Sequence, residues 1–342
     1  MSKILVTGGT GYIGSHTVVE LYNAGYTPVI IDNLSNSNIK ILDQIEQIIG
    51  IKPEFHQFDL CDEEKVFDFV KKQNDITGII HFAASKAVGE SVQEPLKYYH
   101  NNFFSLINLL NAYQDRPVNF VFSSSCTVYG EPDELPVTES AEVKKATSPY
   151  GNTKQIAEEI LEEVAAVKEN YHIISLRYFN PVGAHESGLI GELPIGVPQN
   201  LLPFITQTAI GKREKLIVFG DDYNTPDGSC IRDYIHVVDL AKAHVAAIRR
   251  LEAKEADQRY EVFNVGTGIG YSVLEAIRAF EKAAQVKLNY EIGPRREGDV
   301  IKVWGEVSKS EKELGWKAEL GIEEMMASAW KWEKYLKDNP IA

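Results

Sequence analysis

Val6-Thr7-Gly8-Gly9-Thr10-Gly11-Tyr12-Ile13-Gly14 is the stretch that decides the fold of this 342-residue chain. It follows the apolar run Ile4-Leu5-Val6 and precedes a helix-like segment from His16 to Ala24. A strand, a glycine turn and a helix N-terminus in this order hold a pyrophosphate, because the glycines allow a sharp turn, close approach of backbone N–H groups and tight helix packing. The positive end of the helix also faces the anion. The stretch predicts a dinucleotide site, and a purely structural glycine turn is the alternative.

An acidic residue after the second apolar run indicates which dinucleotide is bound. Asp32 follows Pro28-Val29-Ile30-Ile31 and lies about twenty residues beyond the glycines, the usual place of the ribose-binding acid. A carboxylate there can accept a hydrogen bond from a ribose hydroxyl and would repel a 2′-phosphate. We therefore predict NAD rather than NADP as the cofactor.

The composition is that of an ordinary globular enzyme. Hydrophobic residues make up 44% and charged residues 25% of the chain, and a chain of this length supports one large domain or two closely packed ones. No stretch approaches the ~18 uninterrupted apolar residues of a membrane span. The N-terminus runs directly into the first strand, so we expect no cleavable signal. The three cysteines lack metal spacing and fit a reducing cytosol, so the expected location is cytoplasmic.

Charge and histidine spacing exclude several classes of partner. The formal net charge of −14 argues against binding to nucleic acid or to an acidic membrane surface. The eight histidines form no helical pair and no cluster with cysteine, so no metal site is expected. A small anionic substrate would need local donors, and Arg232, Arg295 and Arg296 stand out against the acidic background.

The first 130 residues alternate short apolar runs with helical patterns. Strands are predicted at 3–6, 28–31, 54–58, 78–82 and 119–122, and helices at 38–49, 63–73 and 95–113. This alternation predicts right-handed crossovers and a Rossmann-type, doubly wound parallel sheet of the α/β class. Ligands bind beyond the carboxyl ends of such strands. One rim should therefore hold Asp32, Asp59, Phe82-Ala83-Ala84 and the serines at 123–125.

Two positions on this rim have a structural alternative. Ala83 and Ala84 would let a cofactor approach the backbone, but small residues also serve tight packing of a strand against a helix. Asp59 could cap a helix instead of contacting a ligand, since Asp62 and Glu63 follow it. The residues themselves leave both questions open.

Beyond residue 175 the pattern changes. After a strand at 173–178, a Gly/Pro-rich run from Asn180 to Pro203 is too long for a plain connection and suggests a lid or substrate loop. Strands are predicted at 215–220 and 260–265, and helices at 238–251, 272–284 and 322–336. We interpret the row Trp330, Trp332 and Tyr335 as packing. We expect an NAD-binding domain over 1–180 with about 235–265, interleaved with a smaller α/β substrate domain over 181–234 and 266–342.

A tyrosine and a lysine four residues apart are the candidates for proton transfer. Tyr150 and Lys154 share a face if Ser148-Pro149 opens a helix. A free tyrosine has a pKa near ~10, but an ammonium nearby and the positive nicotinamide of bound NAD both favour the phenolate. A serine at the end of the neighbouring strand, such as Ser125, could hydrogen-bond the same reacting oxygen. These groups would take a proton from a secondary alcohol while its hydride leaves. A surface helix with an exposed tyrosine and lysine is the alternative.

Together these motifs resemble the extended short-chain dehydrogenase/reductase family. Five longer blocks resemble the nucleotide-sugar epimerases of that family: Lys86-Ala-Val-Gly-Glu-Ser91, Ser123-Ser-Ser-x-Thr-Val-Tyr-Gly130, Arg177-Tyr-Phe-Asn-Pro-Val-Gly-Ala-His185, Arg232-Asp-Tyr-Ile-His236 and Arg295-Arg-Glu-Gly-Asp299. The likeness runs from about residue 3 to 335. It implies that UDP-galactose and UDP-glucose are interconverted by transient oxidation at C4 with tightly held NAD, in a homodimer.

The resemblance also implies a role for particular residues. Tyr150 would be the base at the sugar 4-hydroxyl, Lys154 would lower its pKa and bind the nicotinamide ribose, and Ser125 would assist. NAD would contact these residues together with Gly8, Gly11, Tyr12, Ile13, Gly14, Asp32, Asn33, Asn36, Ser37, Asp59, Leu60, Phe82, Ala83, Ala84, Lys86, Asn101 and Phe179. The UDP-sugar would lie among Lys86, Ser125, Asn180, Asn200, Phe219, Arg232, Arg296, Asp299 and Val303.

The two predicted substrate arginines suit a diphosphate, because a guanidinium binds phosphate oxygens through two parallel hydrogen bonds. The alternative is that Arg232 and Arg296 form surface ion pairs with the adjoining Asp233 and Glu297.

The chain departs from the family pattern at two positions. Cys126 stands where an alanine is usual after the serines, a small change that should be tolerated. Val303, before Trp304, stands where some family members carry a tyrosine that closes the sugar pocket. The smaller side chain leaves room, which suggests that N-acetylated UDP-hexosamines (UDP-GlcNAc and UDP-GalNAc) are also accepted.

Three other functions compete with this interpretation. Dehydratases that resemble this chain carry Asp-Glu where it has Cys126-Thr127, and the decarboxylases place a carboxylate at the position of Thr127. The missing carboxylates disfavour both. A non-enzymatic NAD-sensing regulator on the same fold would have no need of Tyr150 and Lys154, so their presence counts against it.

Overall fold

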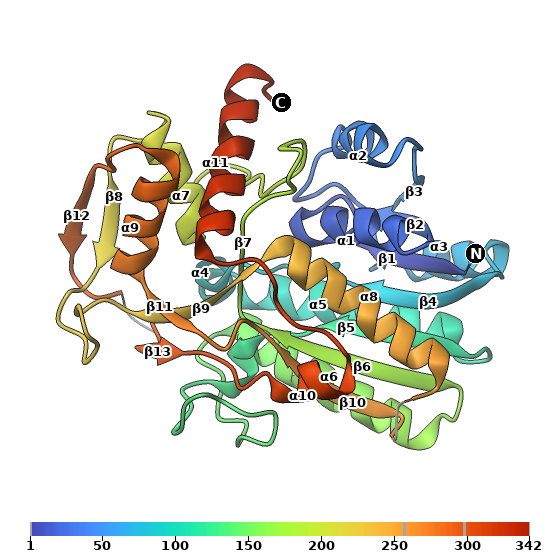
Figure 1. Ribbon diagram of the computed structural model, residues 1–342. Coiled ribbons are helices and arrows are strands. Elements are labelled where there is room, and N and C mark those ends of the chain that lie inside the picture. Colours follow the sequence, from blue (N-terminus) through green and yellow to red (C-terminus); the bar gives the residue numbers. More distant parts are fainter. Residues whose placement is uncertain (1, 256–257, 297–298, 342) are drawn as a thin grey trace.

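The computed structural model describes residues 2–255, 258–296 and 299–341, and its centre is a seven-stranded sheet (Figure 1). The strand order is β10-β6-β5-β4-β1-β2-β3, and every neighbouring pair is parallel. The chain therefore starts in the middle, winds out to one edge and returns to build the other, which confirms the doubly wound sheet. The strands are β1 (Lys3–Thr7), β2 (Thr27–Asp32), β3 (Glu54–Gln57), β4 (Ile76–His81), β5 (Val118–Ser123), β6 (Tyr171–Tyr178) and β10 (Tyr260–Val265).

Helices cover both faces of this sheet, because successive strand residues point to opposite sides. Ile4 and Val6 pack in one buried cluster with α1 (Tyr12–Asn23), α2 (Ile41–Ile49) and α8 (Val237–Ala253). Leu5, between them, packs in the other cluster with α3 (Glu63–Lys72), α5 (Pro95–Tyr113) and α6 (Pro149–Val167). Figure 1 shows α1 and α8 side by side on their face of the sheet.

A second layer of smaller elements stands at the carboxyl edge of the sheet. In it β9 pairs with β7, β11 and β13, and β8 pairs with β12. A third buried cluster lies among β8, α7, α9 and α11. The remaining elements are α4 (Val88–Gln93), the 3₁₀ helix η1 (Cys126–Tyr129), β7 (Asn180–Val182), α7 (Leu201–Ala209), β8 (Leu216–Phe219), β9 (Ile231–His236), β11 (Gly270–Ser272), α9 (Val273–Ala284), β12 (Tyr290–Gly293), β13 (Lys302–Val303), α10 (Ser308–Glu313) and α11 (Ile322–Asp338).

The predicted elements are present, and the structure corrects their details. The first helix begins at Tyr12, inside the glycine stretch, and not at His16. The run from Asn180 to Pro203 is not a loop throughout, because it contains β7 and enters α7 at Leu201. Sequence analysis missed β9, whose charged Arg232 and Asp233 interrupt the apolar pattern. Its Asp233 is nevertheless fully buried, because main-chain donors from other segments surround it.

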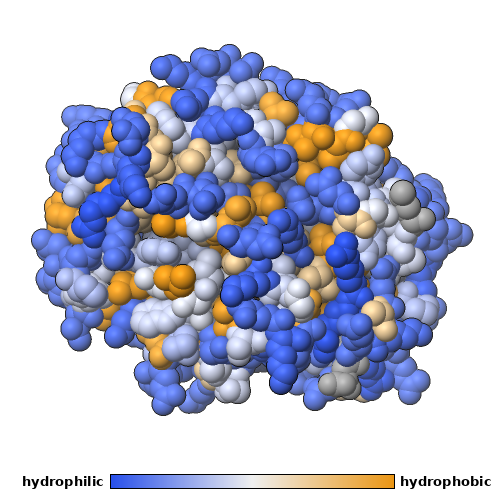
Figure 2. Space-filling model, in the orientation of Figure 1, coloured by the Kyte–Doolittle hydropathy of each residue, from blue (hydrophilic) through white to orange (hydrophobic). Residues whose placement is uncertain are grey.

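The aromatic row at the C-terminus packs the molecule, as predicted. The Trp330 ring meets Phe280 edge-on at a centroid distance of 5.7 Å, and Trp332 stacks on Tyr335 at 5.8 Å. The face shown in Figure 2 is largely hydrophilic, with hydrophobic residues in small groups. Within residues 2–255, 258–296 and 299–341, no helix has the length and apolar character needed to cross a bilayer.

The buried histidines predict that acid weakens the fold. Burial lowers the pKa of His16 and His81 to about 3 and that of His236 and His244 to about 4. The unfolded chain takes up protons near pH ~6.5 while the folded chain does not. Stability is therefore complete above that pH and falls as the pH drops towards the folded-state values, by up to about 1.4 kcal/mol per pH unit for each histidine.

Urea unfolding at a series of pH values between 8 and 5 measures this slope. His244→Gln should reduce the slope, because it removes one buried imidazole, whereas substitution of the exposed His100 by glutamine should leave it unchanged. Equal slopes for the wild type and His244→Gln would contradict the prediction.

Candidate active site at the carboxyl edge of the sheet

The glycine stretch forms a tight turn between β1 and α1. Gly8 has a φ of +70° and its N–H donates to the Ile31 carbonyl at 2.7 Å. A Cβ on Gly14 would stand 2.2 Å from the Gly8 carbonyl oxygen, so this crossing of helix and strand requires glycine. No side chain caps the N-terminus of α1 at Gly11. The N–H groups of a twelve-residue helix are therefore left at the switch point of the sheet, which fits a pyrophosphate.

Asp32 ends β2 and is tied to the glycine stretch. Its carboxylate accepts hydrogen bonds from the N–H of Thr10 at 3.2 Å, the N–H of Leu34 at 2.8 Å and the hydroxyl of Ser37 at 3.1 Å. The hydroxyls of Thr10 and Ser37 are 2.7 Å apart. Two predicted cofactor residues, Asp32 and Ser37, thus lie together beside the turn, while Asn36 is exposed.

Asp59 belongs to the same rim and does not cap a helix. Its carboxylate accepts from the Asn33 side chain at 3.0 Å and from the N–H of Cys61 at 2.8 Å. Burial acts to raise the pKa of Asp59, but these hydrogen bonds outweigh it and the pKa is lowered. Asp62 caps α3, by accepting from the N–H of Lys65. The helix-cap interpretation of Asp59 is therefore wrong.

Three other predicted cofactor residues, Leu60, Phe82 and Asn101, are held in different ways. The Leu60 side chain is in the hydrophobic core, so only its backbone can face a ligand. The Phe82 ring packs against the His244 ring at 4.6 Å between centroids. Asn101 donates to Asn102 at 3.0 Å.

The segment after β4 packs closely against the glycine turn. The N–H of Phe82 donates to the Thr7 carbonyl and that of Ala83 to the Thr7 hydroxyl, at 3.1 and 3.3 Å. A Cβ on Gly8 would lie 3.0 Å from the Ala83 nitrogen. The backbones of the two turns are thus in contact, which supports the packing interpretation of Ala83, and its approach to a cofactor stays a prediction.

The serines that end β5 meet the N-terminus of α6. Ser125 caps η1, and its hydroxyl oxygen accepts from the N–H of Thr127 at 3.2 Å and the Thr127 hydroxyl at 3.0 Å. Ser148 caps α6 by accepting from the N–H of Gly151. The helix therefore starts where its first two turns place Tyr150 and Lys154 against the end of β5, and Ser125 is near enough to act on the pKa of Tyr150.

Both helix residues are buried, so the exposed-surface alternative is wrong. Tyr150 is 8% and Lys154 4% exposed. The Lys154 ammonium donates to the Ser123 carbonyl at 2.6 Å and lies 4.6 Å from the centroid of the Phe122 ring and 6.0 Å from that of Tyr150.

Burial controls the protonation of both side chains. It lowers the pKa of Lys154 to about 7. It also raises the pKa of Tyr150, and Tyr178 adds to that rise while Ser125 opposes it. In the protein chain alone the pKa of Tyr150 is therefore raised, whereas the sequence analysis expects the nearby Lys154 ammonium to lower it.

On the substrate side, Arg232 does not pair with its neighbour. The Asp233 carboxylate accepts from Thr267 N–H and hydroxyl at 2.9 and 2.7 Å and from the N–H groups of Gly268 and Gly305 at 3.0 and 3.3 Å. The Arg232 guanidinium donates to the Ile231 carbonyl at 2.9 Å. The ion-pair interpretation of Arg232 with Asp233 is therefore wrong.

Arg296 gathers with two other predicted substrate residues. Its guanidinium pairs with Asp299, with nitrogen–oxygen distances between 2.6 and 3.1 Å, and lies 5.4 Å from the centroid of the Phe219 ring. Arg295 pairs instead with Asp222 at 2.7 Å. Glu297, the partner that the alternative required, lies with Gly298 outside the described residues.

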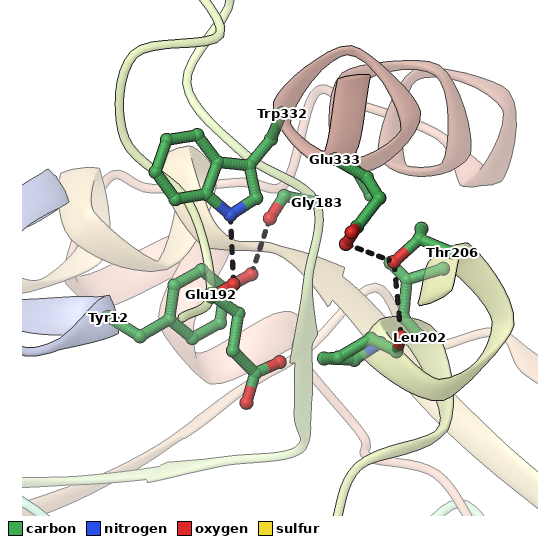
Figure 3. A pocket seen from close by; sticks show the side chains of 9 residues that line it. Tyr12, Gly183, Glu192, Leu202, Thr206, Trp332 and Glu333 are labelled. Atoms are coloured by element: carbon green, nitrogen blue, oxygen red, sulfur yellow. Dashed lines mark hydrogen bonds between the residues drawn. The ribbon is translucent and has the colours of Figure 1, made fainter. Parts of the chain in front are cut away.

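Glu192 is a functional candidate that sequence analysis missed (Figure 3). Its carboxylate accepts from Asn200 at 2.6 Å and is 3.5 Å from the Lys86 ammonium, so it joins a predicted NAD contact to a predicted sugar contact. Its carbonyl oxygen accepts from the Trp332 indole at 2.8 Å, and the Tyr12 hydroxyl nearby donates to the Gly183 carbonyl at 2.7 Å. Nothing in the sequence indicates this role, because Glu192 is a single acidic residue inside a Gly/Pro-rich run.

Val303 lies beside the catalytic end of β5. It is 6% exposed and packs in a cluster with Phe179, Val128 and Tyr129, with Cys126 against it. Asn180 begins β7 and pairs in register with Tyr234 of β9. Strand β9 carries Arg232 as well, and β13 pairs Val303 with Arg232. The second layer thus brings its predicted substrate residues to the strand ends that hold the catalytic ones.

Asp233→Asn should destabilise the protein. An amide cannot accept all four hydrogen bonds without turning its NH₂ group towards donors, so about 3 kcal/mol of unfolding free energy should be lost. Asp222→Asn, at an exposed acid paired with Arg295, should change stability by less than about 1 kcal/mol. Thermal or urea unfolding of both variants measures the difference, and equal losses would contradict the prediction.

Comparisons with known proteins agree on one family. The family model described as GDP-mannose 4,6 dehydratase matches residues 5–329. A UDP-glucose 4-epimerase of Dictyostelium discoideum is 52% identical over 97% of this chain and 95% of its own. Two crystal structures each cover 99% of both chains. The UDP-glucose 4-epimerase of Stenotrophomonas maltophila, with bound NAD and formylated UDP-arabinopyranose, has a TM-score of 0.94 at 46% identity. That of Bifidobacterium longum, with NAD⁺ and UDP, has a TM-score of 0.92 at 48% identity.

Proposed function

The chain belongs to the UDP-glucose 4-epimerases of the extended short-chain dehydrogenase/reductase family, and from this we propose that it interconverts UDP-galactose and UDP-glucose with NAD as resident cofactor. The observation that carries the proposal is the buried contact of Tyr150, Lys154 and Ser125 at the end of β5. It stands on the same sheet edge as the glycine turn.

The proposed cofactor site fits the residues present. The uncapped N–H groups of α1 would face the pyrophosphate, and Asp32 would accept from a ribose hydroxyl. The Asn33–Asp59 pair would line the same end of the site. When bound, NAD supplies the acceptor that takes a hydride from C4 of the sugar and later returns it.

The proposed proton transfer uses the buried phenol. Tyr150 would take the proton of the sugar 4-hydroxyl as the C4–H bond gives up its hydride, and return that proton after the 4-keto sugar has turned over in the site. Burial makes the phenolate costly, so the reaction needs positive charge nearby. Lys154 would provide one charge and the oxidised nicotinamide the other, while Ser125 would orient the shared oxygen.

The proposed substrate contacts hold the nucleotide and leave the sugar free to turn. Arg232 and Arg296 would bind the diphosphate, with Asp299 orienting the Arg296 guanidinium. The exposed Phe219 ring beneath Arg296 offers an apolar surface for the base. Asn180, Asn200 and Lys86 would complete the contacts.

The rival functions lack the residues that they need. Cys126 and Thr127 begin η1 where the dehydratases and decarboxylases require carboxylates, and the Thr127 hydroxyl is bound to Ser125. A non-catalytic NAD sensor would not need a buried Tyr150 and Lys154. The family model that bears the dehydratase description therefore supports the family rather than that reaction.

We further propose a cytoplasmic homodimer in which residues 1–180 with about 235–265 bind NAD and the rest bind the UDP-sugar. Exposed apolar side chains line α4 and one face of α5, at Val88, Val92, Leu96, Phe104 and Ile107. Apolar groups on one face support a protein contact, and a second copy is the simplest partner. The unpaired cysteines suit a reducing compartment.

Purified protein should convert UDP-galactose to UDP-glucose without added NAD. Tyr150→Phe should lower kcat by at least about 100-fold, because it removes the proton acceptor, while the protein keeps its NAD and its fold. Product chromatography and the cofactor content after denaturation measure the two effects. Unchanged turnover by Tyr150→Phe would contradict the assignment.

The buried Val303 supports a second proposal, that N-acetylated UDP-hexosamines are also substrates. Val303→Tyr should fill space beside Phe179 and reduce turnover of UDP-N-acetylglucosamine at least about tenfold, while turnover of UDP-glucose falls less. Separate incubations with the two sugars measure this. Failure of both the wild type and Val303→Tyr to turn over the N-acetyl substrate would end the idea.

A further inference from the structure

Glu158 is a buried carboxylate on the same helix face as the two catalytic residues. Tyr150, Lys154 and Glu158 follow one another at intervals of four residues on α6, so they lie on successive turns of one face. Glu158 is 7% exposed. The proton transfer described above gives it no role.

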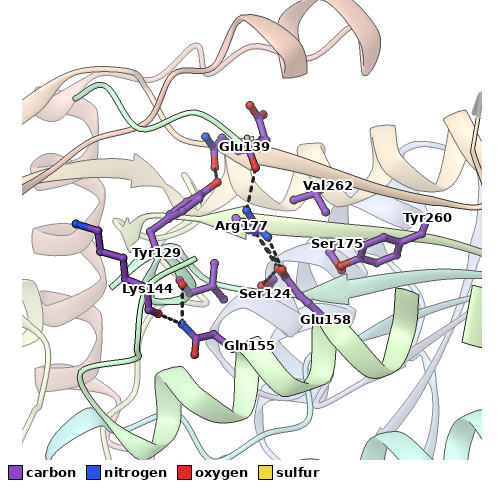
Figure 4. Close-up of polar contacts among 12 residues, drawn as sticks. Ser124, Tyr129, Glu139, Lys144, Gln155, Glu158, Ser175, Arg177, Tyr260 and Val262 are labelled. Atoms are coloured by element: carbon purple, nitrogen blue, oxygen red, sulfur yellow. Dashed lines mark hydrogen bonds and ion pairs between the residues drawn. The ribbon is translucent and has the colours of Figure 1, made fainter. Parts of the chain in front are cut away.

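The Glu158 carboxylate ties the helix to two strands of the sheet (Figure 4). It accepts hydrogen bonds from Nε of Arg177 at 3.0 and 3.1 Å and from a terminal nitrogen of the same guanidinium at 2.6 Å. It also accepts from the hydroxyl of Ser124, which is fully buried. Arg177 belongs to β6, and Ser124 directly follows β5. One side chain therefore fixes the spacing between α6 and both strand ends.

Ser124 is the middle residue of the serine turn, Ser123–Ser125, whose last member is the proposed catalytic serine. The Ser123 carbonyl before it accepts from the Lys154 ammonium, and Ser125 after it acts to lower the pKa of Tyr150. A shift of Ser124 would move both neighbours, because they share its backbone. The contact with Glu158 thus holds the serine turn in register with Tyr150 and Lys154.

Glu158 also supports the charge of Lys154. Burial lowers the pKa of Lys154 to about 7, and the Glu158 carboxylate acts in the opposite direction. Burial keeps the neighbouring His81 neutral by lowering its pKa and keeps Tyr178 neutral by raising its pKa to about 12. Other titratable groups act on the same side chains. Tyr98 and Cys126 interact with Tyr150. Tyr129 and Tyr260 interact with the Glu158–Arg177 pair, and these two tyrosines also interact with Glu139 and Glu162, respectively. Without Glu158, the buried Arg177 guanidinium would lose the carboxylate that balances its charge.

We propose that Glu158 is a positioning residue of the reaction, which holds Ser123–Ser125 against α6 and keeps the Lys154 ammonium charged. It acts through Lys154 and Ser125 and does not touch the sugar. The inference rests on the proposed epimerase function and adds a residue to its site.

The test compares kcat against pH for holoenzyme carrying Glu158→Gln with the wild type. Loss of the carboxylate should make Lys154 release its proton more easily, so the alkaline limb of the kcat profile should move down by on the order of one pH unit. At pH 8.5 kcat should fall about tenfold, whereas KM should stay within about twofold because no substrate contact is lost. Glu158→Asp keeps the charge and should restore the limb.

A matched control separates this effect from the loss of a buried ion pair. Glu261 and Arg250 form a pair with the same burial and two nitrogen–oxygen contacts of 2.8 Å, on β10 and α8. Glu261→Gln should destabilise the protein to a similar extent and leave the pH limb in place. The proposal is overturned if the alkaline limb of the kcat–pH profile of Glu158→Gln stays where it is in the wild type. It is also overturned if Glu261→Gln shifts that limb by the same amount.

A second variant decides the question if Glu158→Gln fails to fold. Ser124→Ala removes the strand contact but no charge, so kcat should fall several-fold with no shift of the pH limb. Unchanged kcat in Ser124→Ala would overturn the positioning role. An inactive wild-type holoenzyme would instead refute the epimerase function itself.

Discussion

A buried ammonium group needs an acceptor, and the hydrogen bond from Lys154 to the Ser123 carbonyl meets that need. The contact joins α6 to the end of β5 and places a positive charge under the Tyr150 ring. Its cost is desolvation, which lowers the pKa of Lys154 and raises that of Tyr150. Burial thus disfavours the Tyr150 phenolate in the protein chain alone, and further positive charge in the pocket would favour it.

The parallel sheet makes this arrangement useful, because it sets the cofactor turn and the proton-transfer groups on one edge. Gly8 and Ala83 touch through their backbones at the ends of β1 and β4, and the serines end the next strand. On the other side, Asp32 ends β2 and Asp59 follows the end of β3. The ends of the parallel strands therefore bring residues that are far apart in the chain to the same edge of the sheet.

The second layer carries Arg232 and Arg296, which we propose bind an anionic substrate, in a chain whose net charge is −14. Local contacts explain how cationic side chains can remain available to an anionic ligand in an acidic chain. The buried Asp233 has its carboxylate taken by main-chain and hydroxyl donors, so Arg232 beside it is left to act as a cation. Glu192 and Asp299, by contrast, lie directly against Lys86 and Arg296, where they orient the donors and limit the local positive charge.

The sequence alone determined the sheet, the cofactor turn and the Tyr150–Lys154 pair, because each depends on periodicity or on spacing within a few residues. Strand alternation, glycines beside one another and an interval of four on a helix are local properties. The tertiary structure decided what long-range contacts control: that Asp233 is bound by donors other than Arg232, that Glu192 joins Lys86 to Asn200, and that Glu158 reaches Ser124 and Arg177. A charged side chain has no preferred partner until the fold brings donors to it, so its role cannot be read from its neighbours in sequence.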